Sequence, residues 1–232
     1  MNFLPFGAID IGSNAIRLLI MNAIEYPDET KYKKISLIRI PLRLGADVFS
    51  CRRISERKSN QLLHAMNGYR HIIDAYQLLN YRACATSAMR EAENGPELIR
   101  KIKDEIGIRL ETITGKEEAE IIFNTGIAQM LDPKKDYLYV DVGGGSTEVT
   151  VVSKNHKVEQ ESFNIGTVRM LNQHTDQQEV ERFKAFMGKQ AAKLKNTSLI
   201  GSGGNINKLF KLMGKKFGET ISPDELHHMY NY

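Results

Sequence analysis

The feature that most constrains the fold is a pair of similar segments 131 positions apart in the chain. Residues 10–20 read DIGSNAIRLLI, and residues 141–151 read DVGGGSTEVTV. Each segment opens with an aspartate, Asp10 or Asp141, two positions before a glycine. Because duplicated domains leave duplicated sequence signals of this kind, the sequence predicts two similar halves.

Each copy is predicted to be a β-hairpin whose turn consists of small residues. An apolar run precedes the turn, at 6–11 and at 137–142, and another follows it, at 15–24 and at 147–152. Backbone N–H groups at such a turn are unshielded and can bind phosphate oxygens, while the aspartate at the strand end can hold a cation. Two facing copies would therefore form a two-sided phosphate clamp.

The rest of the chain alternates between strand and helix patterns. In the first half the pattern predicts strands at 31–44, 81–85 and 108–113, a helix capped by Ser55, a helix ending at Gly107, and a helix from Thr114 to Met130. In the second half it predicts a strand at 158–165, a helix at 175–194, a strand at 198–200, and a glycine-rich loop at 201–204 leading into a helix. This alternation is typical of an α/β fold. The segment DPKKD, at 132–136, predicts a boundary between a first domain of 1–131 and a second of 132–232.

Composition sets the class of protein and excludes several functions. The 232 residues are 41% apolar and 26% charged, which is typical of a folded globular chain. Apolar runs stop far short of the ~20 residues that span a membrane, and the N-terminus lacks a secretory pattern. We therefore expect a cytoplasmic protein with no membrane partner. The net charge of +4 would help to attract an anionic substrate but is too small to indicate a nucleic-acid polymer as a partner.

Three glutamates stand at positions where chemistry could use them. Glu117 is explained by structure, since it completes a capping box with Thr114. Glu118 follows in the first turn, where the helix dipole favours an anion, and Glu148 lies on the strand that leaves the second turn. From local sequence alone, an exposed helix or strand position explains Glu118 and Glu148 at least as well as a catalytic role.

Five motifs, taken together, resemble the exopolyphosphatase / guanosine pentaphosphate phosphatase family. In chain order they are GAIDIGSNAIR (7–17), ATSAMREAEN (85–94), TGKEEA (114–119), VDVGGGSTE (140–148) and GSGGN (201–205). This family belongs to the superfamily of actin, sugar kinases and chaperone ATPases. The resemblance implies two ribonuclease-H-like domains related by duplication, each a mixed sheet with flanking helices, and an active site in the cleft between them. It also implies Mg²⁺ and hydrolysis of a terminal phosphoanhydride in inorganic polyphosphate or a guanosine alarmone.

The resemblance also implies roles for individual residues. Glu118 and Glu148 correspond to the family's catalytic acids, and Asp141 and Asp10 to metal-site carboxylates. The phosphate-loop positions correspond to Ser13, Asn14, Gly144, Gly145 and Ser146. Arg90 is assigned to a substrate phosphate, the alternative being a salt bridge with Glu91 or Glu93.

The chemistry expected of this family fits these residue types. Phosphoanhydride hydrolysis needs a positioned water and neutralisation of charge on the transferred group. We therefore assign Glu148 mainly to the water and Glu118 to positioning the water or the metal. Arg17 stands in the first copy where Glu148 stands in the second, so the second half is predicted to be the catalytic half.

The sequence alone leaves several points open. In the family the second domain continues well past 201–204, whereas this chain ends at Tyr232 inside a helix predicted to begin near Ser222. We therefore expect the second domain to be incomplete at its C-terminal end. An ATP-dependent kinase or ATPase, with a nucleotide pocket around 201–205, is an alternative function, and so is a non-catalytic polyphosphate- or alarmone-binding regulator. The choice between polyphosphate and alarmone, the substrate's chain length, and assembly as a homodimer are also open.

Overall fold

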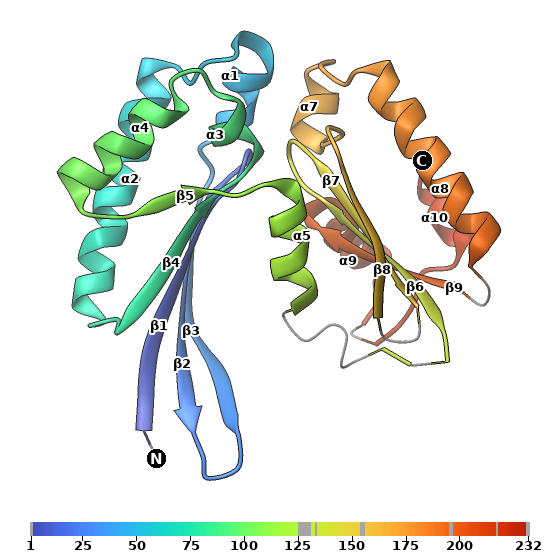
Figure 1. The fold of residues 1–232 in the computed structure, drawn as a ribbon, viewed down its shortest axis with the longest axis horizontal. Helices are drawn as coiled ribbons and strands as arrows, with labels where there is room; N and C mark the ends of the chain where they lie inside the picture. The colour runs from blue at the N-terminus through green and yellow to red at the C-terminus, as the bar shows by residue number, and fades with distance from the viewer. Residues whose placement is uncertain are drawn as a thin grey trace.

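The chain forms two mixed β-sheets, one in each half, with helices packed on them (Figure 1). The computed structural model describes residues 2–124, 131–132, 134–153, 156–194, 197–216 and 218–230, except for the side chains of 122, 123 and 156. The fold is α/β, as the alternation of strand and helix patterns predicts, and none of the described helices is long and apolar enough to cross a membrane.

The first sheet has the strand order β3-β2-β1-β4-β5. Its antiparallel part consists of β1 (Asn2–Ile11), β2 (Ile16–Glu25) and β3 (Thr30–Ile40). Two strands then join in parallel, β4 (Asn80–Ala85) beside β1 and β5 (Leu110–Thr112) beside β4. The loop between β1 and β2 and the carboxyl end of β4 therefore meet at one edge of this sheet.

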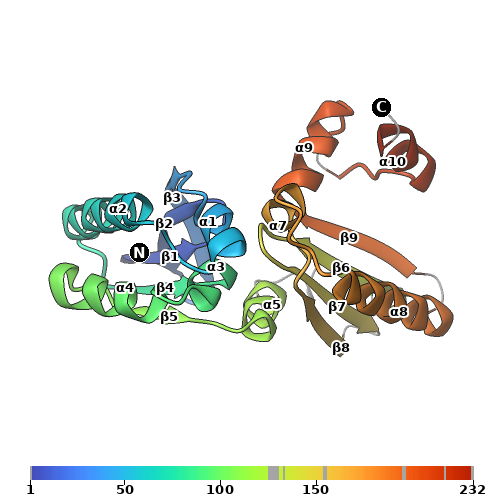
Figure 2. The same ribbon diagram turned by 90° about the horizontal axis from the view of Figure 1, so that it is seen from above.

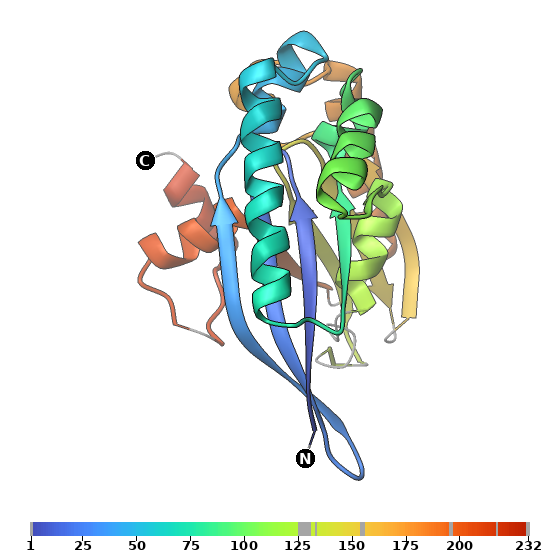
Figure 3. The ribbon, with the colours of Figure 1, turned by 90° about the vertical axis from the view of Figure 1, so that its left-hand side faces the viewer.

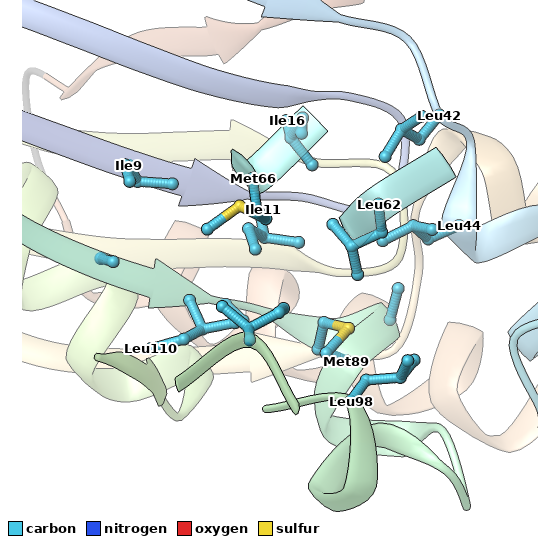
Figure 4. Packing of buried hydrophobic residues seen from close by; sticks show 14 of the residues in the cluster. Ile9, Ile11, Ile16, Leu42, Leu44, Leu62, Met66, Met89, Leu98 and Leu110 are labelled. Atoms are coloured by element: carbon cyan, nitrogen blue, oxygen red, sulfur yellow. The ribbon is translucent and has the colours of Figure 1, made fainter. Parts of the chain in front are cut away.

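Helices cover one face of the first sheet (Figure 3). They are α1 (Leu44–Cys51), α2 (Glu56–Ala75), α3 (Ser87–Glu91), α4 (Gly95–Lys101) and the π-helical turn η1 (Ile102–Ile106). Apolar side chains of α2 recur at spacings of three and four and pack against the sheet, with Leu62 and Met66 fully buried (Figure 4). This face holds the larger hydrophobic core of the molecule.

Two local predictions for the first half were wrong. The strand predicted at 31–44 ends at Ile40, and Leu44 already belongs to helix α1. Arg43 turns the chain between them in a left-handed conformation, φ 53°, which the apolar pattern does not signal. The helix α3 was also missed, because a five-residue helix is too short to show helical periodicity.

The second sheet has the order β8-β7-β6-β9. Its hairpin consists of β6 (Asp136–Val142) and β7 (Thr147–Ser153), β8 (His156–Phe163) adds antiparallel to β7, and β9 (Thr197–Gly203) lies parallel to β6. This order and these directions match those of β3-β2-β1-β4 in the first sheet. The duplication seen in the sequence is therefore a duplication of sheet topology.

Among the described residues, the helices of the second half are α7 (Thr167–Leu171), α8 (Gln177–Lys193), α9 (Gly204–Leu212) and α10 (Pro223–Tyr230). Phe186 of α8 packs edge-on against Phe163 of the sheet, in a core much smaller than that of the first half. The glycine-rich loop predicted at 201–204 is wrong, because β9 continues to Gly203 and α9 begins at Gly204. Short α7 was not predicted.

Helix α5 (Gly115–Asn124) lies between the two halves (Figure 2) and packs on β7 and β8. The side-chain amide of Gln160 donates to the carbonyl of Lys116 at 2.8 Å, and Lys157 pairs with Glu120 at 2.9 Å. The part of the predicted helix at 125–130 falls outside the described residues. The domain boundary at 131/132 stays a prediction, but α5, which precedes it, already contacts the second sheet.

Candidate active site

The two glycine-rich turns line the same cavity, which has a volume of about 250 Å³. Of the predicted site residues, the cavity is lined by Asp10, Ser13, Asn14, Glu118, Asp141, Gly144, Gly145 and Ser146. Asp10 and Asp141 thus share one cleft although they come from different sheets. This is the facing arrangement that the matched turns predict, and it brings unshielded backbone N–H groups and carboxylates to one place.

The turns approach each other so closely that one of them requires glycine. A Cβ atom on Gly145 would lie 2.4 Å from the Ser87 hydroxyl and 2.5 Å from the Phe49 ring. The hydroxyls of Ser13 and Ser87 are hydrogen-bonded to each other at 2.8 Å directly beside this contact. Gly145 therefore lets the second phosphate turn touch the first half of the molecule.

Arg169 joins the same turn to the first half, and sequence reasoning missed it. Its Nε donates to the carbonyl of Gly145 at 2.9 Å, and its Nη2 contacts the Glu91 carboxylate at 2.7 Å. The guanidinium also lies 4.0 Å from the centre of the Phe49 ring. Arg169 is only 9% exposed. In the sequence, the presence of an arginine within the mostly apolar segment 165–171 is the feature that could have indicated a role for Arg169.

Glu117 and Glu118 diverge at the start of α5, as predicted. The Glu117 carboxylate accepts the backbone N–H of Thr114 at 2.7 Å, and the Thr114 hydroxyl accepts the N–H of Glu117 at 3.1 Å. Glu118 instead lines the cavity, where its Oε2 is buried without a hydrogen-bond partner among the described residues. Burial raises the pKa of Glu118 to about 8, and the nearby negative charge of Glu148 acts in the same direction.

Glu148 is almost completely buried, at 2% exposure, and is not among the residues that line the cavity. Its Oε1 accepts a hydrogen bond from the Ser162 hydroxyl at 3.0 Å. Burial raises its pKa to about 6, although hydrogen bonds from Ser146 and Ser162 work against that rise. Helix α5 packs closely on this pair, because a Cβ on Gly115 would lie 2.3 Å from the Ser162 hydroxyl and 3.3 Å from the Glu148 carboxylate.

The two hairpins differ at one equivalent cross-strand position. Asp10 lies opposite Arg17, and the two form an ion pair of 2.9 Å. Asp141 lies opposite Glu148 and accepts a hydrogen bond from the Ser202 hydroxyl. One hairpin therefore pairs its aspartate with a cation, whereas the other places a second carboxylate beside it.

Comparison with known proteins identifies the family. The model of the Ppx/GppA phosphatase family matches residues 27–217. The chain belongs to this family. A solved exopolyphosphatase from Cytophaga hutchinsonii is 27% identical and superposes with a TM-score of 0.77 over 95% of this chain and 73% of that one. The Aquifex aeolicus Ppx/GppA family member is also 27% identical, with a TM-score of 0.72 over 97% of this chain and 73% of that one.

Curated relatives are longer than this chain. A bifunctional 3-dehydroquinate synthase/phosphatase from Fusobacterium nucleatum is 36% identical over 73% of this chain, which spans 26% of that protein. Exopolyphosphatase 2 from Mycobacterium tuberculosis is 30% identical over 73% of this chain, which spans 55% of that protein. The chain thus spans between about a quarter and just over half of these two relatives.

In this Ppx/GppA chain, Arg90 lies near the carboxylates rather than at the cavity wall. Its Nη1 donates to the carbonyl of Ile113 at 2.7 Å, and its positive charge opposes the rise in the pKa of Glu118 and Glu148. Within the described part of the chain no ion pair joins Arg90 to Glu91 or Glu93, and Glu91 pairs with Arg169 instead.

The residues of this Ppx/GppA site fit a magnesium ion held partly by substrate. No three acidic, histidine or cysteine side chains form a metal cage among the described residues. Mg²⁺, however, commonly takes only one or two carboxylates from the protein and completes its shell with water and phosphate oxygens. Asp141 and Asp10 at the cavity wall offer such carboxylates, and Glu118 adds a buried oxygen, Oε2, that has no hydrogen-bond partner among the described residues.

Proposed function

We propose that this protein hydrolyses the terminal phosphoanhydride bond of inorganic polyphosphate. The observation that carries the proposal is one cavity lined by both phosphate turns, with a wall carboxylate and a buried carboxylate of raised pKa, Glu118 and Glu148, from α5 and β7. Membership of the Ppx/GppA family and the similarity to exopolyphosphatases support it.

In the proposed reaction, water attacks the terminal phosphorus and the bond from that phosphorus to its bridging oxygen breaks. Orthophosphate leaves, together with a chain shorter by one phosphate. Glu148 takes the proton of the attacking water, since its pKa of about 6 leaves it mostly ionised at neutral pH and close to the operating range. Glu118, mostly protonated in the free enzyme, orients the water or the metal.

The backbone N–H groups of the two turns and the side chains of Ser13, Asn14 and Ser146 bind the terminal phosphate. Asp141, with Asp10, would hold Mg²⁺, which when bound supplies positive charge to the transferred phosphoryl group. Arg90, which donates to the carbonyl of Ile113, contributes positive charge and opposes the rise in the pKa of both glutamates. These side chains position and neutralise the phosphate rather than form covalent bonds to it.

Guanosine pentaphosphate is the second candidate substrate, since its terminal phosphate presents the same anhydride. A kinase or ATPase would instead need a base and ribose pocket beside β9 and α9, and a regulator would bind without turnover. The location in the cytoplasm and a homodimer remain predictions.

The test measures Mg²⁺-dependent phosphate release from polyphosphate, guanosine pentaphosphate and ATP. We expect release from polyphosphate, and we expect Glu148→Gln to lower turnover by roughly 10²–10⁴-fold, the range for loss of a general base. Polyphosphate binding should persist or strengthen, because the variant removes a negative charge near a polyanion. The matched control is Glu159→Gln, at a half-buried glutamate of β8 that pairs with Lys189 and does not line the cavity, and it should keep full turnover.

Binding without phosphate release by the wild type would favour the regulator. Selective turnover of ATP would favour the kinase or ATPase. Unchanged turnover in Glu148→Gln would remove Glu148 from the mechanism and leave Glu118 as the base.

A further inference from the structure

Two arginines stand side by side on one wall of the cavity. Arg17 of β2 and Arg39 of β3 are directly opposite each other in the antiparallel pair, and both line the cavity. Like charges at directly opposite positions destabilise a sheet. An adjacent pair of guanidinium groups facing a cavity therefore needs an anion to offset the repulsion.

Only one of the two has such an anion within the described residues. Arg17 pairs with Asp10 at 2.9 Å. Arg39 is exposed, and in the described part of the chain no hydrogen bond or ion pair reaches its guanidinium. The negative partner of Arg39 is thus not supplied by this part of the protein, although the side chain borders the cavity where the phosphate turns meet.

The proposed substrate supplies the missing charge. The turns at Ser13 and at 143–146 can surround one phosphate group, whereas a polyphosphate carries further charged phosphates beyond the one that is cleaved. Arg39 lies on a neighbouring strand of the same wall, and a guanidinium can bind phosphate oxygens through two parallel hydrogen bonds.

We propose that Arg39 forms, beside Arg17, an outer anion subsite that binds the phosphates next to the cleaved one. This inference rests on the proposed function, because it takes polyphosphate as the occupant. The subsite would select for polyanionic chains over single phosphate groups and would contribute to affinity rather than to the chemical step.

The test compares Arg39→Gln with Arg39→Lys and with a matched control, Arg57→Gln. Arg57 is an exposed arginine of α2 that is not among the cavity residues. We expect Arg39→Gln to raise the KM for long-chain polyphosphate about tenfold, the usual scale for losing a charge-assisted hydrogen bond, with kcat within twofold. The inhibition constant of inorganic phosphate, which needs only the inner turns, should stay within twofold.

The salt dependence of KM, and a variant that retains the positive charge at position 39, provide two further tests. The difference in KM between wild type and Arg39→Gln should shrink as NaCl is raised, because salt screens exposed charges. Arg39→Lys should recover part of the affinity, and Arg57→Gln should match the wild type. Thermal unfolding should show no loss of stability in Arg39→Gln, since the change relieves a like-charge pair.

An unchanged KM in Arg39→Gln would overturn the proposal, and so would an equal weakening of polyphosphate and inorganic phosphate. Direct binding of polyphosphate is measured in the Glu148→Gln background, with and without Arg39→Gln, to separate the subsite from catalysis. If the wild type releases no phosphate while binding still depends on Arg39, the proposed hydrolysis fails and the subsite stands.

Discussion

The first and second hairpins share a backbone plan but differ in the charge opposite the aspartate. In the first hairpin Asp10 is paired with Arg17, so its negative charge is compensated within the sheet. In the second, Asp141 faces Glu148, and the helix α5 adds Glu118 nearby. A single cross-strand position thus gives one hairpin an aspartate paired with a cation and the other two adjacent carboxylates.

Under the proposed function, this difference shows how a duplicated fold can divide one reaction between its halves. Both copies retain the turn that exposes backbone N–H groups, which suffices for binding phosphate. Beside the second copy, burial raises the pKa of Glu118 and of Glu148, and the negative charge of Asp141 adds to both rises. Raised pKa values of this kind are typical of catalytic sites. In the first hairpin burial also raises the pKa of Asp10, but the ion pair with partly exposed Arg17 opposes that rise.

The largest loss of phosphate release should come from replacing Asp141, and it should exceed the loss from replacing Asp10. We expect Asp141→Asn to lower phosphate release by about 100-fold or more at fixed Mg²⁺, because the loss of a metal carboxylate removes several kcal/mol of charge stabilisation. Asp10→Asn should cost less than about tenfold, because Arg17 already neutralises Asp10. Mg²⁺ titrations of phosphate release check both variants, and equal losses would break the proposed asymmetry.

A second prediction concerns the dependence of stability on pH. The pKa of Glu118 is raised from 4.5 to about 8, so the folded protein binds more protons than the unfolded chain between these values. The free energy of unfolding should therefore fall as the pH rises through this window. We expect Glu118→Gln to be more stable than the wild type by up to ~5 kcal/mol at pH 9 and equal to it at pH 4.

Urea unfolding of the substrate-free protein at a series of pH values measures this effect. Asp10→Asn is the control from the first hairpin. Because Arg17 opposes the rise in the pKa of Asp10, this variant should gain less free energy of unfolding at high pH than Glu118→Gln. Parallel stability curves for Glu118→Gln and the wild type would show that Glu118 does not titrate as an acid of raised pKa.

A third prediction tests the contact through which Arg169 joins the second turn to the first half of the molecule. Arg169→Lys keeps the charge near Glu91 but loses the hydrogen bond from Nε to the Gly145 carbonyl. We expect kcat/KM to fall about tenfold, since small displacements of binding groups are costly for a positioned reaction. Steady-state kinetics measure the change.

Arg182→Lys is the matched control for Arg169→Lys. Arg182 also pairs with a glutamate and lies over an aromatic ring, Phe163, but all of these contacts are within the second half. It should leave kcat/KM within twofold. An equal loss in both variants would mean that arginine packing in general, and not the joint between the halves, affects activity.

The smallest effect should come from Ser162→Ala. The change removes the hydrogen bond that lowers the pKa of Glu148, so this pKa should rise above about 6. Because ionised Glu148 is needed, the acid limb of the pH–rate profile should move to higher pH by less than about one unit. The rate at pH 8.5 should be unchanged, and a profile that moves to lower pH would contradict the role of Glu148 as the base.

Long elements and the duplicated turns could be predicted from the sequence because their signals are local. The apolar spacing of α2, the capping box at Thr114 and the glycine turns each depend on residues within a few positions of one another. Short helices such as α1 and α3, and the end of β3 at Ile40, could not be predicted, since they depend on packing and on the left-handed turn at Arg43.

The sequence by itself determined the duplication, the α/β class, and the cavity residues that lie on the two matched turns, because each depends on local turn residues or amphipathic periodicity. Only the tertiary structure decided which charges meet. Strand register decides that Asp10 pairs with Arg17. Strand register and the packing of α5 and α7 likewise decide that Glu118 is buried near Glu148 and that Arg169 contacts Gly145. Electrostatic interactions act through distance and burial in space, and neither is set by separation along the chain.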